Sequence, residues 1–174
     1  RMENLDGAGR NIHSRMQGIP CIFDIDERLR VMDQFENYRQ VLSLGMPPLE
    51  SMGSPETVTE LAQLANDGLA ELCAQHPDRF PGYLAALPMN APDAAARELE
   101  RVFEADTGAV GVQIHTNING LPLDDPQFLP VFEVAEKFDR PVFLHPSRGE
   151  EMPDYASEDK SRYEIWWTFG WPYE

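Results

Sequence analysis

Hydrophobic positions along the chain follow two spacings in alternation. In longer segments apolar residues recur every three to four positions, which predicts amphipathic helices. Shorter apolar runs lie between these segments and predict strands. The predicted helices span residues 24–35, 54–76, 90–105 and 125–138. The predicted strands span residues 39–44, 83–87, 109–114 and 141–144.

Local signals support several of these boundaries. Ser54-Pro55-Glu56 combines a capping serine, a proline at the first helical position and an acid at the positive end of the helix dipole. Within residues 125–138, Pro130 lacks a backbone donor, so the regular helix is expected to start only there. Residues 109–114, AVGVQI, are apolar almost throughout, as in strands buried on both faces.

The alternation of strands and helices predicts an α/β fold built from parallel βαβ units. We expect a single domain over residues 1–174, in which residues 1–23 form a loop and residues 24–174 form the βα units. Periodicity is compatible with both an open doubly wound sheet and a barrel. Neither GxGxxG nor GxxxxGK[ST] follows a predicted strand, which disfavours the nucleotide-binding open sheets.

Composition and charge narrow the classes of partner. The 30 acidic and 14 basic residues give a formal net charge of −16, which disfavours binding to nucleic acid or to an anionic membrane surface. No apolar run approaches the ~20 residues that a membrane span needs. Cys21 and Cys73 have no CxxC spacing, so we expect reduced thiols in a cytoplasmic protein.

Two of the four histidines directly follow predicted strands. Active sites of parallel α/β folds lie at the carboxyl ends of the strands. His145 follows PVFL and is a candidate ligand for zinc or a similar divalent metal, although a core histidine bonded to a carbonyl is an equally good interpretation. His115 follows AVGVQI and is a candidate for substrate contact or acid–base catalysis, with loop scaffolding as the alternative.

Arginines and tryptophans supply further candidates for substrate binding. Arg148 and Arg162 could pair with a substrate carboxylate, and Arg15 is a weaker candidate of the same kind. An aromatic cluster near the C-terminal end could form a core or line a pocket for a flat substrate, with Trp167 and Trp171 as candidate contacts. His76 is expected to cap a helix end.

Several segments together resemble a known family. VFLHPSR at residues 142–148 resembles a strand followed by His-Pro in the amidohydrolase-related proteins typified by aminocarboxymuconate-semialdehyde decarboxylase. Residues 82–101 and 108–146 resemble the preceding units of that family, and WWTFGWPYE resembles its aromatic segment after the His-Pro strand. The resemblance runs in unbroken order over about residues 24–174, and it is specific as a set.

The resemblance implies a (β/α)8 barrel that holds one divalent metal, commonly zinc. This chain would be a partial stretch of about four βα units of that barrel. The family's metal ligands are an HxH pair, the histidine of the His-Pro strand and a late aspartate, and a further histidine helps to activate the metal-bound water. Only the His-Pro histidine maps onto this chain, as His145, because Ile12-His13-Ser14 lacks the second histidine of an HxH pair.

The same resemblance implies the activity. We expect a metal-dependent nonoxidative decarboxylase of an aromatic or muconate-like carboxylic acid, with that small molecule as its partner. A metal-dependent hydrolase of a lactone, ester or amide uses the same site and is the alternative. A third possibility is a non-catalytic barrel protein that has lost the metal. Relatives often form dimers or tetramers, so a homodimer or homotetramer is also expected.

Overall fold

A computed structural model describes residues 16–163 and 165–173, and its central feature is a parallel sheet. The sheet has four strands in the order β1-β2-β3-β6, and every neighbouring pair is parallel. A short antiparallel hairpin, β4 with β5, follows β3. The strands are β1 (Val41–Leu42), β2 (Gly82–Ala85), β3 (Ala109–His115), β4 (Asn117–Ile118), β5 (Leu121–Pro122) and β6 (Val142–His145).

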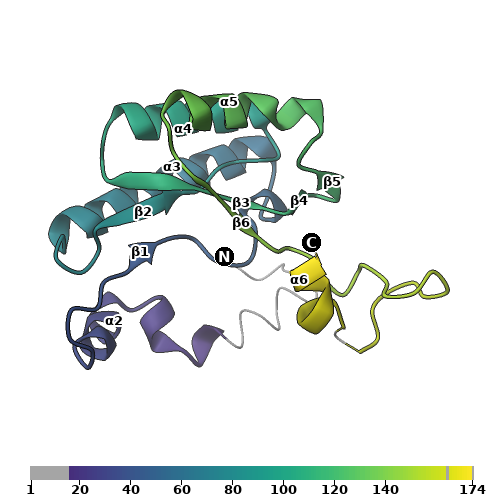
Figure 1. Ribbon diagram of the computed structural model, residues 1–174, viewed down its shortest axis with the longest axis horizontal. Coiled ribbons are helices and arrows are strands. Elements are labelled where there is room, and N and C mark those ends of the chain that lie inside the picture. The colour runs from purple at the N-terminus through teal and green to yellow at the C-terminus, as the bar shows by residue number, and fades with distance from the viewer. Residues whose placement is uncertain (1–15, 164, 174) are drawn as a thin grey trace.

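Three helices cover one face of the sheet, and the remaining helical segments lie on its other side or in loops (Figure 1). The covering helices are α3 (Pro55–Gln75), α4 (Pro92–Glu104) and α5 (Leu129–Lys137). The others are α2 (Ile25–Met32), α6 (Trp171–Tyr173), the 3-10 turns η1 (Pro20–Ile22), η2 (Leu49–Ser51) and η3 (Pro126–Phe128), and the π-helical turn η4 (Trp166–Gly170). Among the described residues, none of the helices combines the length and apolarity that crossing a bilayer requires.

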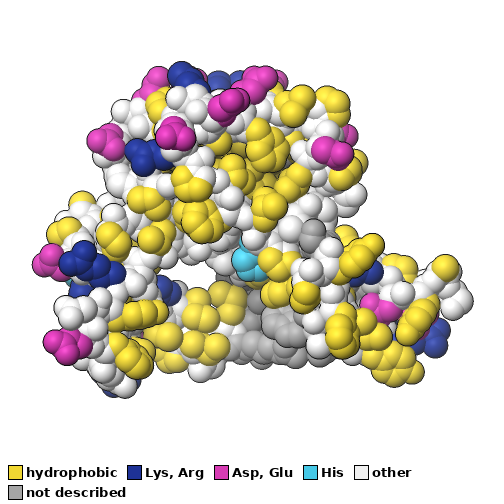
Figure 2. All heavy atoms as spheres, viewed as in Figure 1, with side chains coloured by type: hydrophobic (Ala, Val, Ile, Leu, Met, Phe, Trp, Pro, Cys, Tyr) yellow, Lys and Arg dark blue, Asp and Glu magenta, His cyan; other side chains and the backbone are white. Residues whose placement is uncertain are grey.

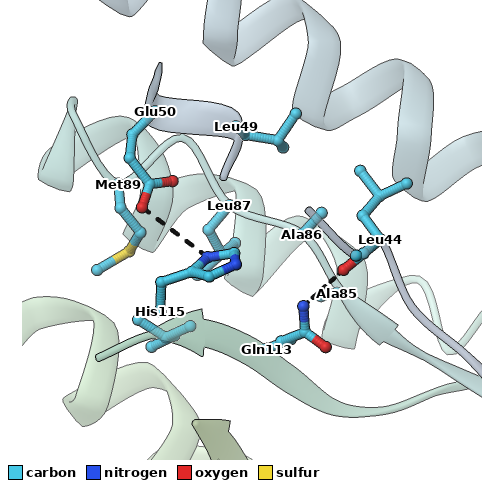
Figure 3. A pocket seen from close by; sticks show the side chains of 11 residues that line it. Leu44, Leu49, Glu50, Ala85, Ala86, Leu87, Met89, Gln113 and His115 are labelled. Carbon is cyan, nitrogen blue, oxygen red and sulfur yellow. Dashed lines mark hydrogen bonds and ion pairs between the residues drawn. The ribbon is translucent and has the colours of Figure 1, made fainter. Parts of the chain in front are cut away.

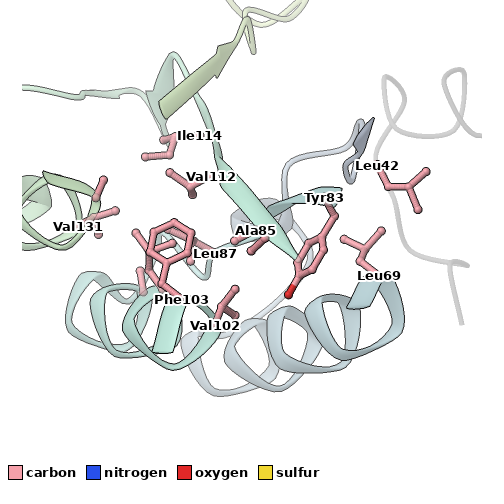
Figure 4. Packing of buried hydrophobic residues seen from close by; sticks show 14 of the residues in the cluster. Leu42, Leu69, Tyr83, Ala85, Leu87, Val102, Phe103, Val112, Ile114 and Val131 are labelled. Atoms are coloured by element: carbon pink, nitrogen blue, oxygen red, sulfur yellow. The ribbon is translucent and has the colours of Figure 1, made fainter. Parts of the chain in front are cut away.

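The core lies between the sheet and the covering helices (Figure 4). Val112 and Ile114 of β3 are 0% and 1% exposed and belong to the same buried cluster as Phe103 of α4 and Val131 of α5. Because side chains alternate along a strand, Gln113 and His115 of β3 face away from this core. The helices therefore fix the sheet from one side and leave polar groups of β3 on the other.

The strand at the sheet edge is only partly buried. Phe143 and Leu144 of β6 are 50% and 58% exposed, and no described strand pairs with the outer edge of β6. Figure 2 shows hydrophobic side chains around a hollow below the sheet, with a histidine visible at its upper rim. The hollow lies on the side opposite the covering helices.

Most predicted elements are confirmed, with corrections at element ends. Asp24 caps α2 as expected by accepting from the Glu27 amide at 3.1 Å, but the helix ends at Met32 and leaves Phe35 outside it, 58% exposed. The segment before residue 24 is not all loop, since Pro20–Ile22 forms a 3-10 turn. Residues 1–15 lie outside the described part of the chain. The regular part of the fourth helix begins at Leu129, one residue before the expected proline.

A buried polar network fixes the end of β2. The Asn66 side chain of α3 is 1% exposed, accepts a hydrogen bond from the Ala86 amide (2.8 Å) and donates to the Ala86 carbonyl (3.0 Å). It also donates to the Glu98 carboxylate of α4 at 2.8 Å, and Arg101 pairs with that carboxylate from the next turn. Two helices therefore hold the backbone where β2 ends, at the same edge of the sheet as His115.

Replacing Asn66 with alanine tests this network. The change leaves the Ala86 amide, the Ala86 carbonyl and the Glu98 carboxylate without their buried partner, so we expect a loss of about 3 kcal/mol in the free energy of unfolding. Urea denaturation measures it. The matched control is Gln63→Ala on the exposed face of the same helix, expected to change the free energy by less than about 0.5 kcal/mol. Equal effects of the two changes would contradict a role for the network.

Candidate active site at the carboxyl ends of the strands

The strand register brings two histidines together. His115 and His145 are Cα partners at the ends of β3 and β6, and their ring centroids lie 5.2 Å apart. The pairing continues past the strands, because the Thr116 amide donates to the His145 carbonyl at 3.0 Å. Neighbouring parallel strands end at the same edge of a sheet, where α/β enzymes place their active sites.

The His145 ring is oriented by its own backbone neighbour. Its Nδ1 lies 2.7 Å from the carbonyl oxygen of Pro146, and this contact favours the tautomer that carries the proton on Nδ1. The lone pair of Nε2 is then available for a metal, as in metal-binding histidines whose other nitrogen donates to a carbonyl. The contact with the Pro146 carbonyl also agrees with the alternative of a histidine bonded to a carbonyl, although His145 is half-buried and does not lie in the core.

Loops after the two strands are tied to each other beside His145. The Asn117 side chain donates to the Ser147 hydroxyl at 2.8 Å, and the Ser147 amide donates to the Thr116 hydroxyl at 3.2 Å. These bonds link the segment after β3 to the segment after β6. The backbone on both sides of the histidine pair is thereby held in place.

Aromatic side chains from the C-terminal end complete one side of the site. Trp171 approaches the His145 ring edge-on, with centroids 5.6 Å apart and an interplanar angle of 72°. Its indole nitrogen donates to the Arg148 carbonyl at 3.0 Å, and Trp166 packs beside it at 6.2 Å. The chain therefore places an aromatic wall next to the candidate metal ligand.

The arginine and tryptophan candidates have different surroundings. The half-buried Arg148 lies against the backbone at Gly170, and its guanidinium donates to the Pro153 carbonyl at 3.1 Å. The Arg162 side chain is 63% exposed, and its Nε lies 3.7 Å from a carboxylate oxygen of Glu158. Arg15 and the side chain of Trp167 lie outside what the structure describes. His76 is at the helix end as expected, where its backbone amide donates to the Leu72 carbonyl.

A buried acid that the sequence did not reveal lies beside His115. Glu50 of η2 is 6% exposed, and its Oε1 lies 3.9 Å from His115 Nδ1 (Figure 3). This distance is too long for a hydrogen bond. Among the described residues, neither Glu50 Oε1 nor His115 Nε2 has a hydrogen-bond partner. Such a buried unsatisfied group costs about 1–3 kcal/mol, so two of them at one strand edge indicate a function other than stability.

Burial moves the pKa values of this pair in opposite directions. It raises the pKa of Glu50 to about 7, and burial together with the nearby His145 ring lowers the pKa of His115 to about 4. Both shifts favour the uncharged form of the group. The contact at 3.9 Å is therefore weaker than a full ion pair at neutral pH, despite its geometry.

A small cavity adjoins the pair. Its volume is about 20 Å³, enough for one water molecule. Its polar side chains are Glu50, His115 and Gln113, and the Gln113 amide donates to the Leu44 carbonyl. The remaining side chains around it are apolar: Leu44, Leu49, Ala85, Ala86, Leu87, Met89 and Ile114.

The described residues do not form a complete metal site by themselves. Residues 16–163 and 165–173 contain no group of three or more histidine, cysteine, aspartate or glutamate side chains that could bind one ion. A metal site of the expected kind needs three or more protein ligands. His145 fits as one of them through its oriented ring, and the others would have to come from outside the described residues.

Replacing Glu50 with glutamine tests the burial of its carboxyl group. Since the folded state raises the Glu50 pKa from 4.5 to about 7, the folded protein loses stability as pH rises through that window. Glutamine does not ionise, so the variant Glu50→Gln does not have this loss. Its free energy of unfolding relative to wild type should therefore rise by up to about 3 kcal/mol as the pH is raised from about 5 to about 8.5. Urea denaturation at both values measures it. The exposed control Glu60→Gln should show no such dependence on pH. A difference in the free energy of unfolding between Glu50→Gln and wild type that is the same at both pH values would contradict a raised pKa of Glu50.

Comparisons with known proteins agree with the resemblance in the sequence. The model of the amidohydrolase family matches residues 20–172. Gamma-resorcylate decarboxylase of Rhodococcus jostii is 38% identical over 130 residues, which cover 70% of this chain and 39% of the relative. The 2-amino-3-carboxymuconate-6-semialdehyde decarboxylase of Dictyostelium discoideum is 35% identical over 136 residues, covering 76% of this chain and 37% of the relative.

A solved structure shows the same arrangement of strands and helices. The dihydroxybenzoic acid decarboxylase of Polaromonas, determined with bound manganese and the inhibitor 2-nitroresorcinol, superimposes with a TM-score of 0.64 at 34% identity. The alignment covers 84% of this chain and 42% of that one, so this chain spans less than half of the relative's length. The chain belongs to the amidohydrolase family, and its four parallel strands form part of the (β/α)8 barrel of that family.

Proposed function

We propose that the protein carrying this chain is a metal-dependent nonoxidative decarboxylase of an aromatic or muconate-like carboxylic acid. One observation carries the proposal: His145, with its ring oriented through Nδ1, lies at a strand end beside Trp171 in a chain 38% identical to a decarboxylase of an aromatic acid. The named decarboxylases among the relatives favour this activity over hydrolysis of a lactone, ester or amide.

His145 is the proposed ligand of one divalent metal, zinc or the manganese that the Polaromonas relative binds. A metal bound there would supply a Lewis acid that polarises a substrate oxygen. The Pro146 carbonyl keeps the imidazole in the tautomer that offers Nε2. The bonds of Asn117 and Ser147 keep the loops on both sides of His145 from moving apart.

Aromatic and basic groups are proposed to hold the substrate. Trp171 would stack against or flank a planar acid next to His145, since its ring is already placed 5.6 Å from the imidazole. Arg148 is the proposed partner of a carboxylate, and Trp171 anchors its backbone. Trp167 and Arg15 remain proposed substrate contacts on the strength of the sequence.

His115 is the proposed catalytic residue of this chain, in contact with substrate beside His145. Its lowered pKa leaves the imidazole neutral near pH 7, so it would act first as a hydrogen-bonding group. In the reaction the bond from the ring or chain carbon to the carboxylate breaks, carbon dioxide leaves and a proton takes its place. An uncharged imidazole at this position does not repel a positively charged proton donor that approaches the carbon.

A homodimer or homotetramer and a cytoplasmic location stay predictions.

Assay of the protein with 2,6-dihydroxybenzoate, which is gamma-resorcylate, tests the activity. We expect release of carbon dioxide and formation of resorcinol, measured by headspace analysis and chromatography. The comparison substrates are an aryl lactone and an aryl ester of similar size. Acid release from these, without carbon dioxide from any hydroxybenzoate or aminocarboxymuconate substrate, would favour the hydrolase instead.

Replacing His145 with alanine tests the metal ligand. Loss of one ligand should lower the bound metal, measured by elemental analysis of the purified protein, by about tenfold or more. The rate of decarboxylation should fall by orders of magnitude while circular dichroism stays unchanged. His76→Ala, at a helix end away from the strand ends, is the control and should keep the metal. Unchanged metal content in His145→Ala would assign the imidazole a structural role.

A further inference from the structure

We propose that Glu50 and His115 form a subsite that accepts hydrogen bonds from a hydroxyl or amino substituent of the substrate. The inference rests on the proposed function, because it specifies which aromatic or muconate-like acids the site takes. It assigns a role to Glu50, which lies on the turn η2 after β1. It also gives His115 a defined partner in the described structure.

The two side chains form a prepared but unsatisfied pair. Glu50 and His115 are 6% and 7% exposed, and Glu50 Oε1 lies 3.9 Å from His115 Nδ1. A carboxyl oxygen beside Nδ1 favours the tautomer with its proton on Nδ1, which leaves Nε2 as an acceptor. Both Nε2 and Oε1 lack a hydrogen-bond partner among the described residues. Two unsatisfied acceptors match a group that donates protons.

The size and lining of the cavity define the group further. About 20 Å³ holds one water molecule, or one hydroxyl or amino group of a ligand, and is too small for a carboxylate. Apolar side chains such as Leu49, Leu87 and Met89 complete the lining and offer no competing hydrogen bond (Figure 3).

The position of the subsite fits a single small substrate. The His115 ring lies 5.2 Å from the His145 ring, so a planar acid of one ring can place a substituent at His115 while another part lies at His145 and Trp171. The acid group of the substrate would lie on the His145 side, away from Glu50. The subsite therefore selects for the substituent and also orients the ring.

The loop that carries Glu50 is held in place by side-chain hydrogen bonds. The Asn90 side chain, from the segment after β2, donates to the Gly53 carbonyl at 3.2 Å and to the Glu50 carbonyl at 3.5 Å. The Ser51 hydroxyl donates to the Pro48 carbonyl at 2.7 Å. A group fixed in advance binds its ligand at a lower entropic cost.

Calorimetric binding of two ligands to the protein tests the subsite. We expect wild type to bind 2,6-dihydroxybenzoate about tenfold or more tightly than benzoate, which lacks the hydroxyl groups. Glu50→Leu and His115→Phe each remove an acceptor while keeping a side chain of similar bulk. In both variants the ratio of the two dissociation constants should fall toward one, mainly through weaker binding of 2,6-dihydroxybenzoate. Thermal unfolding checks that each variant folds, and Glu50→Met or His115→Leu, which also lack an acceptor, replaces a variant that does not.

Glu60→Gln, an exposed acid on α3, is the matched control and should keep the wild-type ratio. An unchanged ratio in the Glu50 and His115 variants overturns the proposal and leaves the cavity as a site for a structural water. Equal binding of the two ligands by wild type overturns it as well. The proposed activity is judged separately: an intact hydroxyl preference without carbon dioxide release contradicts the decarboxylase and not the subsite. Carbon dioxide release with an unchanged ratio contradicts the subsite alone.

Discussion

The parallel register between β3 and β6 is the constraint on which the site depends. It makes Cα partners of His115 and His145 and carries their rings to within 5.2 Å. A shift by one residue would turn one imidazole toward the helices, because side chains alternate along a strand. The register is fixed by packing on the helical side, where Val112 and Ile114 of β3 are almost completely buried. Apolar contacts on one face of the strand thus position polar groups on the other.

Polar groups buried in this chain fall into two kinds. Asn66 satisfies both backbone groups of Ala86 and a Glu98 oxygen, and it acts as a rigid connection between helices and sheet. Glu50 and His115 lie at the same edge of the sheet, yet each keeps an acceptor without a partner among the described residues. A fold gains nothing from such groups by themselves. The contrast separates residues that maintain the backbone from residues that are available to a ligand.

The sequence predicted the parts of this chain that depend on local patterns. The strand AVGVQI, the capped helix after Ser54 and the two histidines at strand ends all follow from periodicity and capping, and the structure confirms their places. Phe35 was assigned to a helix because apolar spacing continued past the end of α2 at Met32. Glu50 gave no signal, since an acid in a proline-rich loop is usually solvated, and only tertiary packing buries it. The contact of Trp171 with His145 likewise joins positions whose proximity no spacing rule gives.

The outer edge of β6, which no described strand covers, has a consequence for how molecules of this chain behave in solution. Phe143 and Leu144 are half exposed and no strand of the described residues pairs with the outer edge of β6, a combination that favours strand-to-strand association between copies. The formal net charge of −16 opposes that association through mutual repulsion. Salt shortens the range of this repulsion to about 10 Å at 0.1 M. Repulsion between the negative charges thus keeps molecules of this chain dispersed, and a higher ionic strength shifts the balance toward association.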